Sequence, residues 1–331
     1  MNKSFFMNEY EKLMKEISNI NIMASTDDND KSEQKAILSE LIENNLKPLY
    51  RFRKFNDYSL QSFKNDTIYH SHPNDFNDPH DCLIYINENE CEKLVDKTFS
   101  FEKYMNLSAK EFLQAFLEKF PMFNFIQNYS EENHAIQIEQ GRKFLDTLKS
   151  EFKKSNLNLL TLSRNSPKIS CYSEDISSTL MWSHYADYHK GFALEYDFKN
   201  IYKDNAKIIL LPIIYCNERY DATNMAIFNF LFDYYYEDKA SKYQIIEILT
   251  LFNLYLHKGL EWQYEKEWRS FLVNKESMFC SMKPKAVYLG VEMPVEHQAE
   301  IKVIAIQKKI PIYKMYIDLN QKEYKLKMNK L

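Results

Sequence analysis

The spacing of apolar residues along this chain alternates between a helical period and a strand period. Apolar residues recur at helical spacing over residues 5–20, and a second amphipathic stretch opens at Ser32 and ends near Asn45. The polar residues 25–30 between them are typical of a linker. The pattern therefore predicts an N-terminal helical extension over residues 1–46.

After Pro48, short strand-like segments alternate with single helices. The first strand is expected at 49–53, and Asp57 is expected to cap a helix over 58–65. Further strands are expected at 67–71, 167–172, 190–198, 207–215, 266–273, 284–290, 311–318 and 322–328, with helices at 176–187 and 294–307. Strict alternation of strand and helix is absent, so the pattern predicts an α+β fold with a mixed or antiparallel sheet.

The elements after residue 46 are expected to form one α+β domain over residues 47–331. Two stretches within this domain have helical spacing only. Residues 92–156 are helical in pattern throughout and predict an all-helical insertion or lid. Residues 222–258 have aromatic side chains at helical spacing, which predicts a long helix or a helix pair. The loop at 72–81 contains two prolines and several turn-forming Asp and Asn residues.

Composition narrows the class of protein. Hydrophobic residues make up 45% of the chain and charged residues 27%, which is typical of a globular protein with a large core. No run of eighteen apolar residues occurs, and the N-terminus lacks the apolar core of a signal peptide. We therefore expect a cytoplasmic protein without a membrane partner. The net charge of −4 provides no general attraction to nucleic acid.

Glycine and cysteine exclude several kinds of site. The four glycines are widely separated, whereas phosphate-binding loops and dinucleotide-binding folds need clustered glycines. If the protein binds a nucleotide, side chains must therefore hold the phosphates. The five cysteines are scattered and form no C-x-x-C pair, so we expect neither a disulfide framework nor a metal site.

The most unusual segment is Tyr264–Arg269, where Glu265 and Glu267 lie two residues apart. On a strand both side chains would point to the same face, about 7 Å apart. Two carboxylates that close destabilise the fold unless a ligand or cation binds them, or one has a raised pKa. The alternative is solvated charge on a helix, but the neighbouring Trp262 and Trp268 favour a strand entering the core.

Two arginines and a serine are candidates for binding an anionic ligand. Arg51 and Arg53 alternate with aromatic residues, which by itself indicates a half-buried strand with solvated arginines. A guanidinium group can also bind phosphate through two parallel hydrogen bonds, which a glycine-poor chain would need. Ser71, which follows Tyr69, is informative only in combination with these residues.

Two further motifs permit both a structural and a functional interpretation. The run Phe76–Asp81 (F-N-D-P-x-D) is expected to form either a rigid turn or a loop that contacts the ribose or base of a ligand. The helix at 176–187 presents an aromatic face with Trp182 and Tyr185, which favours packing on the sheet. One of its histidines could still reach a pocket.

Several of these runs together resemble a family of bacterial proteins. They closely resemble the domain-of-unknown-function family twenty-nine seventy-one, and the similarity covers about residues 47–320. The runs concerned are Leu49–Arg53, Ser71 with Phe76–Asp81, Cys171–Asp175, Trp182–Ala186 through Gly191-Phe192, and Glu267–Arg269. The family has no established activity, so this resemblance alone implies no function.

A more distant resemblance is to ADP-ribosyltransferases, including DNA-targeting toxins, which share an arginine, an aromatic-x-Ser and a late Glu-x-Glu. It implies a split sheet, in which Arg51 or Arg53 holds the phosphates of NAD and Ser71 orders the strand beneath the nicotinamide ribose. Glu267 would bond the ribose hydroxyl and stabilise the oxocarbenium ion, and Glu265 would orient or deprotonate the acceptor. Additional expected ligand contacts are Tyr69, Asn77, Asp78, Trp182, His184 and Tyr185.

On this resemblance the chain is expected to be an NAD-consuming effector of a bacterial toxin or antiphage defence system. It would act as an ADP-ribosyltransferase or NAD glycohydrolase, with NAD as substrate and a nucleic acid or protein as acceptor. An antitoxin or a defence-system protein is the expected partner. The alternative is a non-catalytic sensor or binding module on the same fold, in which the carboxylates are structural. The first hypothesis predicts that Glu267→Gln abolishes NAD turnover without lowering the melting temperature.

Overall fold

The computed structural model describes residues 44, 46–98, 108, 110–111, 114, 134–199, 208–227, 230, 254–272 and 277–331. The chain divides into two compact units. The first comprises residues 1–83, 163–219 and 245–331, and the second comprises 84–162 and 220–244. The two N-terminal helices expected before residue 44, and most of the helical stretch expected at 222–258, lie outside the described residues.

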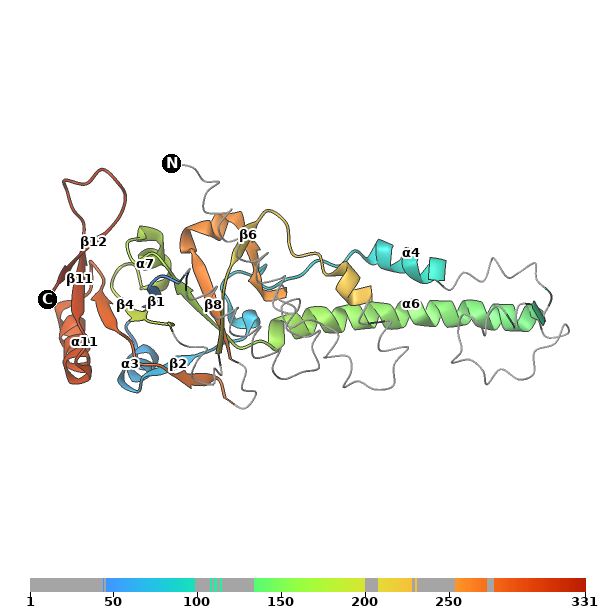
Figure 1. Cartoon of the computed structure of the whole chain (residues 1–331), viewed down its shortest axis with the longest axis horizontal. Coiled ribbons are helices and arrows are strands. Elements are labelled where there is room, and N and C mark those ends of the chain that lie inside the picture. Colours follow the sequence, from blue (N-terminus) through green and yellow to red (C-terminus); the bar gives the residue numbers. More distant parts are fainter. Residues whose placement is uncertain are drawn as a thin grey trace. The chain divides into compact units, whose positions relative to one another are not determined.

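The first unit is built on an eight-stranded sheet, drawn in Figure 1. Its order is β12-β11-β10-β4-β1-β3-β8-β5, and every neighbouring pair is antiparallel except β10 and β11. The strands are β1 (Leu49–Arg53), β3 (Ile169–Ser173), β4 (Phe192–Tyr196), β5 (Ile208–Pro212), β8 (Glu267–Leu272), β10 (Ala286–Leu289), β11 (Ile312–Tyr316) and β12 (Lys327–Lys330). The predicted α+β class with a mixed sheet is therefore confirmed.

Two smaller sheets flank the large one. β2 (Thr67–Tyr69) pairs antiparallel with β9 (Phe279–Ser281), and β6 (Ile214–Cys216) pairs parallel with β7 (His257–Gly259). Two short 3₁₀ helices follow strands of these sheets: η1 (Pro73–Asp75) comes after β2, and η5 (Leu260–Glu265) comes after β7. β7 and η5 matter for function because they lead directly into β8.

Helices cover both faces of the large sheet because successive residues of a strand point to opposite faces. On one face α7 (Thr179–Tyr185) packs Trp182 edge-on against Phe52 of β1, with ring centroids 5.1 Å apart. On the other face α3 (Asp57–Lys64) and α11 (Val295–Lys308) pack against Leu49 of β1 and its neighbours. β1 thus lies between two apolar layers, which fixes the direction of its remaining side chains.

The start of α3 differs from the expectation. Asn56, and not Asp57, caps the helix, because its side-chain oxygen accepts a hydrogen bond of 2.9 Å from the backbone N–H of Ser59. Asp57 is the first helical residue, where its negative charge still interacts favourably with the helix dipole. The helix boundary is therefore shifted by one residue.

The second unit contains helices α4 (Glu88–Thr98) and α6 (His134–Asn165), the latter ending in the first unit. Ion pairs join the two helices, from Lys149 to Asp96 at 2.6 Å and from Lys153 to Glu92 at 2.8 Å. Both helices fall largely within the helical insertion expected over 92–156. Within the described part of the chain, no helix combines the length and apolar character needed to span a bilayer.

Gly191 is required where β4 begins beside the end of β1. A Cβ atom at this position would overlap the backbone carbonyl oxygen of Arg53 and would lie 2.9 Å from that of Ala186. Neither backbone group can move without disturbing β1 or the end of α7. The absence of a side chain at Gly191 therefore sets the position of Arg53.

We expect Gly191→Ala to lower the free energy of unfolding by roughly 1–3 kcal/mol, the usual cost of overpacking. Urea denaturation measures this value. Gly259→Ala is the matched control, because the atoms nearest to its added Cβ belong to the flexible, exposed side chain of Glu261. An equal loss of stability in both variants would contradict the proposed contact.

Candidate functional site

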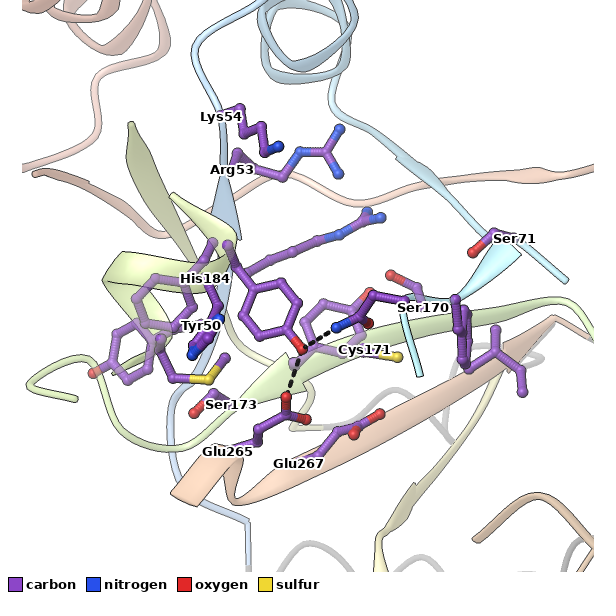
Figure 2. A pocket seen from close by; sticks show the side chains of 18 of the residues that line it. Tyr50, Arg53, Lys54, Ser71, Ser170, Cys171, Ser173, His184, Glu265 and Glu267 are labelled. Carbon is purple, nitrogen blue, oxygen red and sulfur yellow. Dashed lines mark hydrogen bonds between the residues drawn. The ribbon is translucent and has the colours of Figure 1, made fainter. Parts of the chain in front are cut away.

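The candidate site is a pocket between two neighbouring strands that separate from each other. Among the described residues of β1 and β3, the register pairs only Tyr50 with Ser173. Beyond this position the strands diverge, and a pocket of about 500 Å³ lies between them. Figure 2 shows side chains from both strands, including Arg53 and Cys171, around this space. The sheet is thus open in its middle. The volume of the pocket lies in the range of small-molecule binding sites.

Cationic side chains of β1 lie along one end of the pocket. The Arg51 guanidinium is held by a 2.9 Å hydrogen bond to the carbonyl oxygen of Tyr69. Arg53 forms no hydrogen bond or ion pair with any residue that the structure describes. Burial, followed by repulsion from Arg51, lowers the pKa of Arg53 to about 10. An uncompensated, half-buried guanidinium is unfavourable in the free protein and favours an anionic ligand.

The residues that follow Arg53 extend this cationic end. Lys54, which is exposed, and Asn56 and Ser59, at the start of α3, also line the pocket. The N-terminal end of a helix has a partial positive charge and attracts anions. Of the two arginines, Arg53 is therefore the better candidate for holding phosphate, since Arg51 already has a partner.

Carboxylates occupy the opposite part of the pocket, where Figure 2 places Glu265 and Glu267. The prediction that both lie on one strand is wrong for Glu265. It is the last residue of η5, Lys266 then adopts a left-handed conformation with φ of 45°, and β8 begins at Glu267. This turn still brings both carboxylates to one cation, with the Lys258 ammonium 2.5 Å from Glu265 and 2.8 Å from Glu267.

Glu267 is a buried carboxylate that stays ionised near neutral pH. Its Oε2 accepts from Lys258, and its Oε1 accepts a 2.7 Å hydrogen bond from Nε of Arg269. Burial acts to raise the pKa of Glu267, but the charges of Arg269 and Lys258 outweigh it and hold the pKa well below its ordinary value. Both oxygens are therefore engaged by internal cations, and the residue cannot exchange a proton near neutral pH.

This position changes the expected effect of Glu267→Gln. The neutral amide would leave Lys258 and Arg269 with less compensating charge in a buried environment. The expectation of an unchanged melting temperature is therefore replaced by a loss of stability. Loss of activity in that variant would not by itself identify a catalytic role.

Glu265 has different properties. Burial and repulsion from Glu267 raise its pKa to about 7, against the opposing effect of Lys258. Its Oε1 accepts a 2.5 Å hydrogen bond from the hydroxyl of Tyr185, which in turn lies 3.4 Å from the Asn77 amide nitrogen. A carboxyl group that titrates near neutral pH in a pocket is suited to general acid or base chemistry.

The F-N-D-P-x-D loop surrounds this charged cluster. Asp81 accepts two hydrogen bonds of 2.7 Å from Nη2 of Arg269, and Phe76 stacks near the same guanidinium. Asp78 accepts from the backbone N–H of His80 at 2.8 Å and so forms the predicted turn. Each interpretation of the motif therefore applies to part of it. Phe76 and Asp81, at its ends, contact the charged cluster, and Asp78, in its middle, forms a structural turn.

The pocket brings together most of the residues expected from the sequence. Those that line it are Arg51, Arg53, Ser71, Asn77, His184, Tyr185, Glu265 and Glu267. Three expected ligand contacts lie outside the lining. Tyr69 contributes its carbonyl oxygen to Arg51, Asp78 forms the turn, and Trp182 is fully buried, with its indole N–H donating to Ile176. Trp182 thus belongs to the core beneath α7.

Sequence reasoning missed the two buried cations, Lys258 and Arg269. Arg269 follows Glu267 at the strand spacing of two, so the pattern did place both on one face. Lys258 stands alone in an apolar and aromatic run, which is a weak sign of a buried, paired lysine. Among the described residues, no group of His, Cys, Asp and Glu side chains is arranged to hold a metal ion.

One comparison with known proteins concerns this site. Residues 181–270 match the family described as Protein of unknown function (DUF2971). The match confirms the family resemblance over this stretch, which includes Tyr185, Lys258, Glu265 and Glu267 but neither β1 nor the F-N-D-P-x-D loop. No curated protein and no solved structure matches the chain. The resemblance to ADP-ribosyltransferases therefore stays a prediction.

Proposed function

We propose that this protein binds NAD in the pocket between β1 and β3 and transfers its ADP-ribose group to an acceptor or to water. The observation that carries the proposal is the pairing of two unlike ends in one pocket. Arg53, a guanidinium with no described partner, lies at one end, and Glu265, whose pKa is about 7, lies at the other. A ligand with a diphosphate and a ribose matches both ends.

The reaction requires only groups that the pocket contains. The bond between the ribose C1′ and the nicotinamide nitrogen breaks, and its electron pair stays on the nicotinamide, which leaves as the neutral base. The ribose carbon becomes positively charged and is attacked by a lone pair of the acceptor. The proton that the acceptor loses passes to the Glu265 carboxylate. A nearby ionised carboxylate also stabilises the positive charge as it forms.

The structure favours exchanging the two roles expected for the glutamates. Glu267 is neutralised by Lys258 and Arg269, so little of its charge is left for a sugar cation. Glu265 is compensated by Lys258 alone and points toward Tyr185 at the pocket. We therefore assign the reacting carboxylate to Glu265 and a positioning role to Glu267. Ser71 lies beside the start of β3, where its backbone pairs with Ile169.

The proposal is tested by incubating the purified full-length chain with NAD and measuring free nicotinamide, with and without candidate nucleic-acid and protein acceptors. A toxin or defence effector would also deplete NAD when expressed in bacteria. Binding of NAD without release of nicotinamide would support the second candidate function, a non-catalytic sensor. The full engagement of Glu267 by internal cations is the observation that favours this alternative. Absence of both binding and release would overturn the proposal.

Arg53→Met should weaken NAD binding about 10- to 100-fold, the equivalent of losing roughly 1.5–3 kcal/mol of charged hydrogen bonding. Because Arg53 has no described partner, the variant should be at least as stable as the wild type. Isothermal titration calorimetry and urea denaturation measure the two effects. Lys64→Met is the control, since Lys64 is half-exposed at the end of α3 outside the pocket lining. Equal weakening in both variants would contradict the phosphate assignment.

A further inference from the structure

The acidic part of the pocket belongs to a buried cluster of five charged side chains. Its members are Asp81, Lys258, Glu265, Glu267 and Arg269, and each is less than 9% exposed. Three are acids and two are bases, so the fully ionised cluster would have a net charge of −1. A buried excess charge is unfavourable, and the usual response is that one acid retains a proton.

The contacts within the cluster decide which acid that is. Asp81 and Glu267 both contact Arg269 at 2.7 Å, and Glu267 also contacts Lys258 at 2.8 Å. Lys258 is the one described cation that Glu265 contacts, and Glu265 shares it with Glu267 and, at 3.6 Å, with Asp81. Glu265 is therefore the least compensated acid, and it is also the one that meets Tyr185 at the pocket.

We propose that Asp81 is a positioning residue which, through Arg269 and Lys258, sets the pH at which Glu265 gains its proton. Both Asp81 oxygens accept from Arg269, so its carboxylate is directed at the cluster. Its negative charge offsets part of the positive charge of Arg269 and Lys258, which would otherwise stabilise the ionised carboxylates of Glu267 and Glu265. This favours the protonated form of Glu265. The inference deepens the proposed function, since it names the residue that tunes the reacting carboxyl.

The tyrosines around Glu265 do not provide the same control. The titratable and charged side chains that surround it from the packed elements are His184 and Tyr185 of α7, Tyr215 of β6, Lys258 of β7, Tyr264 of η5 and Glu267 of β8. Burial, with Glu265 or Glu267 as the next cause, raises the pKa of each of the three tyrosines. The three tyrosines are therefore neutral near pH 7 and add no charge beside Glu265.

The test is to titrate the Glu265 carboxyl group by NMR in protein labelled with carbon-13 at the glutamate side-chain carboxyl. The signal is assigned by its absence in Glu265→Gln. Asp81→Asn removes one negative charge from the cluster and should lower the titration midpoint of Glu265 by roughly one pH unit. Arg269→Gln removes one positive charge and should raise the midpoint by a similar amount.

Asp78→Asn is the matched control, because Asp78 lies in the same loop, is buried and has a carboxylate that accepts from the backbone N–H of His80. Its contact with Asp81 is made by the backbone alone, which the substitution leaves in place. In this variant the titration midpoint of Glu265 should equal that of the wild type. An unchanged or raised midpoint in Asp81→Asn, or an equal shift in Asp78→Asn, would overturn the inference. If Asp81→Asn does not fold, Asp81→Ser, which removes the same charge from a smaller side chain, takes its place, with the same shift expected.

The measurement needs no turnover of NAD. If nicotinamide release is absent while the midpoints shift as expected, the proposed function fails and the role of Asp81 stands. If nicotinamide is released, its pH profile should move in the same direction as the NMR midpoint in each variant. A merely structural role of Asp81 would lower the amount of active protein and leave the profile in place.

Discussion

Glu265→Gln should reduce nicotinamide release from NAD about 100- to 1,000-fold, the usual effect of removing a preorganised group that stabilises transition-state charge. The amide cannot accept the acceptor's proton or oppose a positive charge on the ribose. It retains the size of the side chain, so NAD binding should change much less than turnover. Steady-state kinetics with saturating NAD separate the two effects.

The same variant should remain folded. Because the pKa of Glu265 is about 7, half of the wild-type carboxyl groups are already neutral at that pH. The amide group that Glu265→Gln introduces can accept from Lys258 through its oxygen and donate to the Tyr185 oxygen through its nitrogen. We expect a change of no more than about 1 kcal/mol in the free energy of unfolding.

Glu261→Gln is the control for this experiment, since Glu261 is an exposed glutamate of the same short helix, η5. It should retain wild-type turnover. Retained turnover in Glu265→Gln would reject the assignment of the reacting carboxylate. Equal loss in both variants would indicate that the charge near η5 matters, and not this particular carboxyl group.

Arg269→Gln should cost about 3–5 kcal/mol of stability at neutral pH, because it leaves buried carboxylates without their principal cation. Arg269 is fully buried and bonds Asp81, Glu267 and the carbonyl oxygen of Tyr255. Gln can replace at most two of these hydrogen bonds and none of the charge. Urea denaturation at pH 7.5 measures the loss, and Arg53→Met serves as the control arginine without a described partner.

The deficit should depend on pH. In the wild type the folded-state pKa of Glu267 lies below its ordinary value of 4.5, so its contribution to stability is present above that pH and is lost as pH falls. In Arg269→Gln only Lys258 opposes the burial of Glu267, so the pKa of Glu267 rises and the folded state gains stability as pH falls through that raised pKa. The difference between the two proteins should therefore begin to shrink as the pH falls toward 4.5 and shrink further below it. A deficit that stays constant down to pH 4 would contradict this account.

The local pattern predicted much of the sheet. β1 has the predicted bounds, and β8, β10 and α11 lie within one or two residues of the expected positions. Boundaries were less predictable where a turn intervenes. The helix expected at 176–187 is shorter, since Ser178 caps its start and three successive residues with positive φ, Asp187, Tyr188 and His189, follow its end. Such a turn depends on close contact with other strands, which no local pattern reveals.

The sequence also predicted that the arginines of β1, Ser71 and the Glu-x-Glu pair share one pocket. It could not predict which arginine lacks a partner, because Arg51 is occupied by the carbonyl oxygen of Tyr69. It placed Glu265 on a strand, since strand periodicity gives no sign of the left-handed Lys266 that ends η5.

By itself, the sequence determined the α+β class, the positions of most strands and the set of polar residues available for chemistry, because these follow from the spacing of apolar residues and from residue type. Only the tertiary structure decided the charge state of each carboxylate. Asp81 and Arg269 are 188 residues apart in the chain, and Tyr185 and Glu265 are 80 apart. The pKa of a buried acid depends on the cations and dipoles within a few ångströms of it, and those come from distant segments.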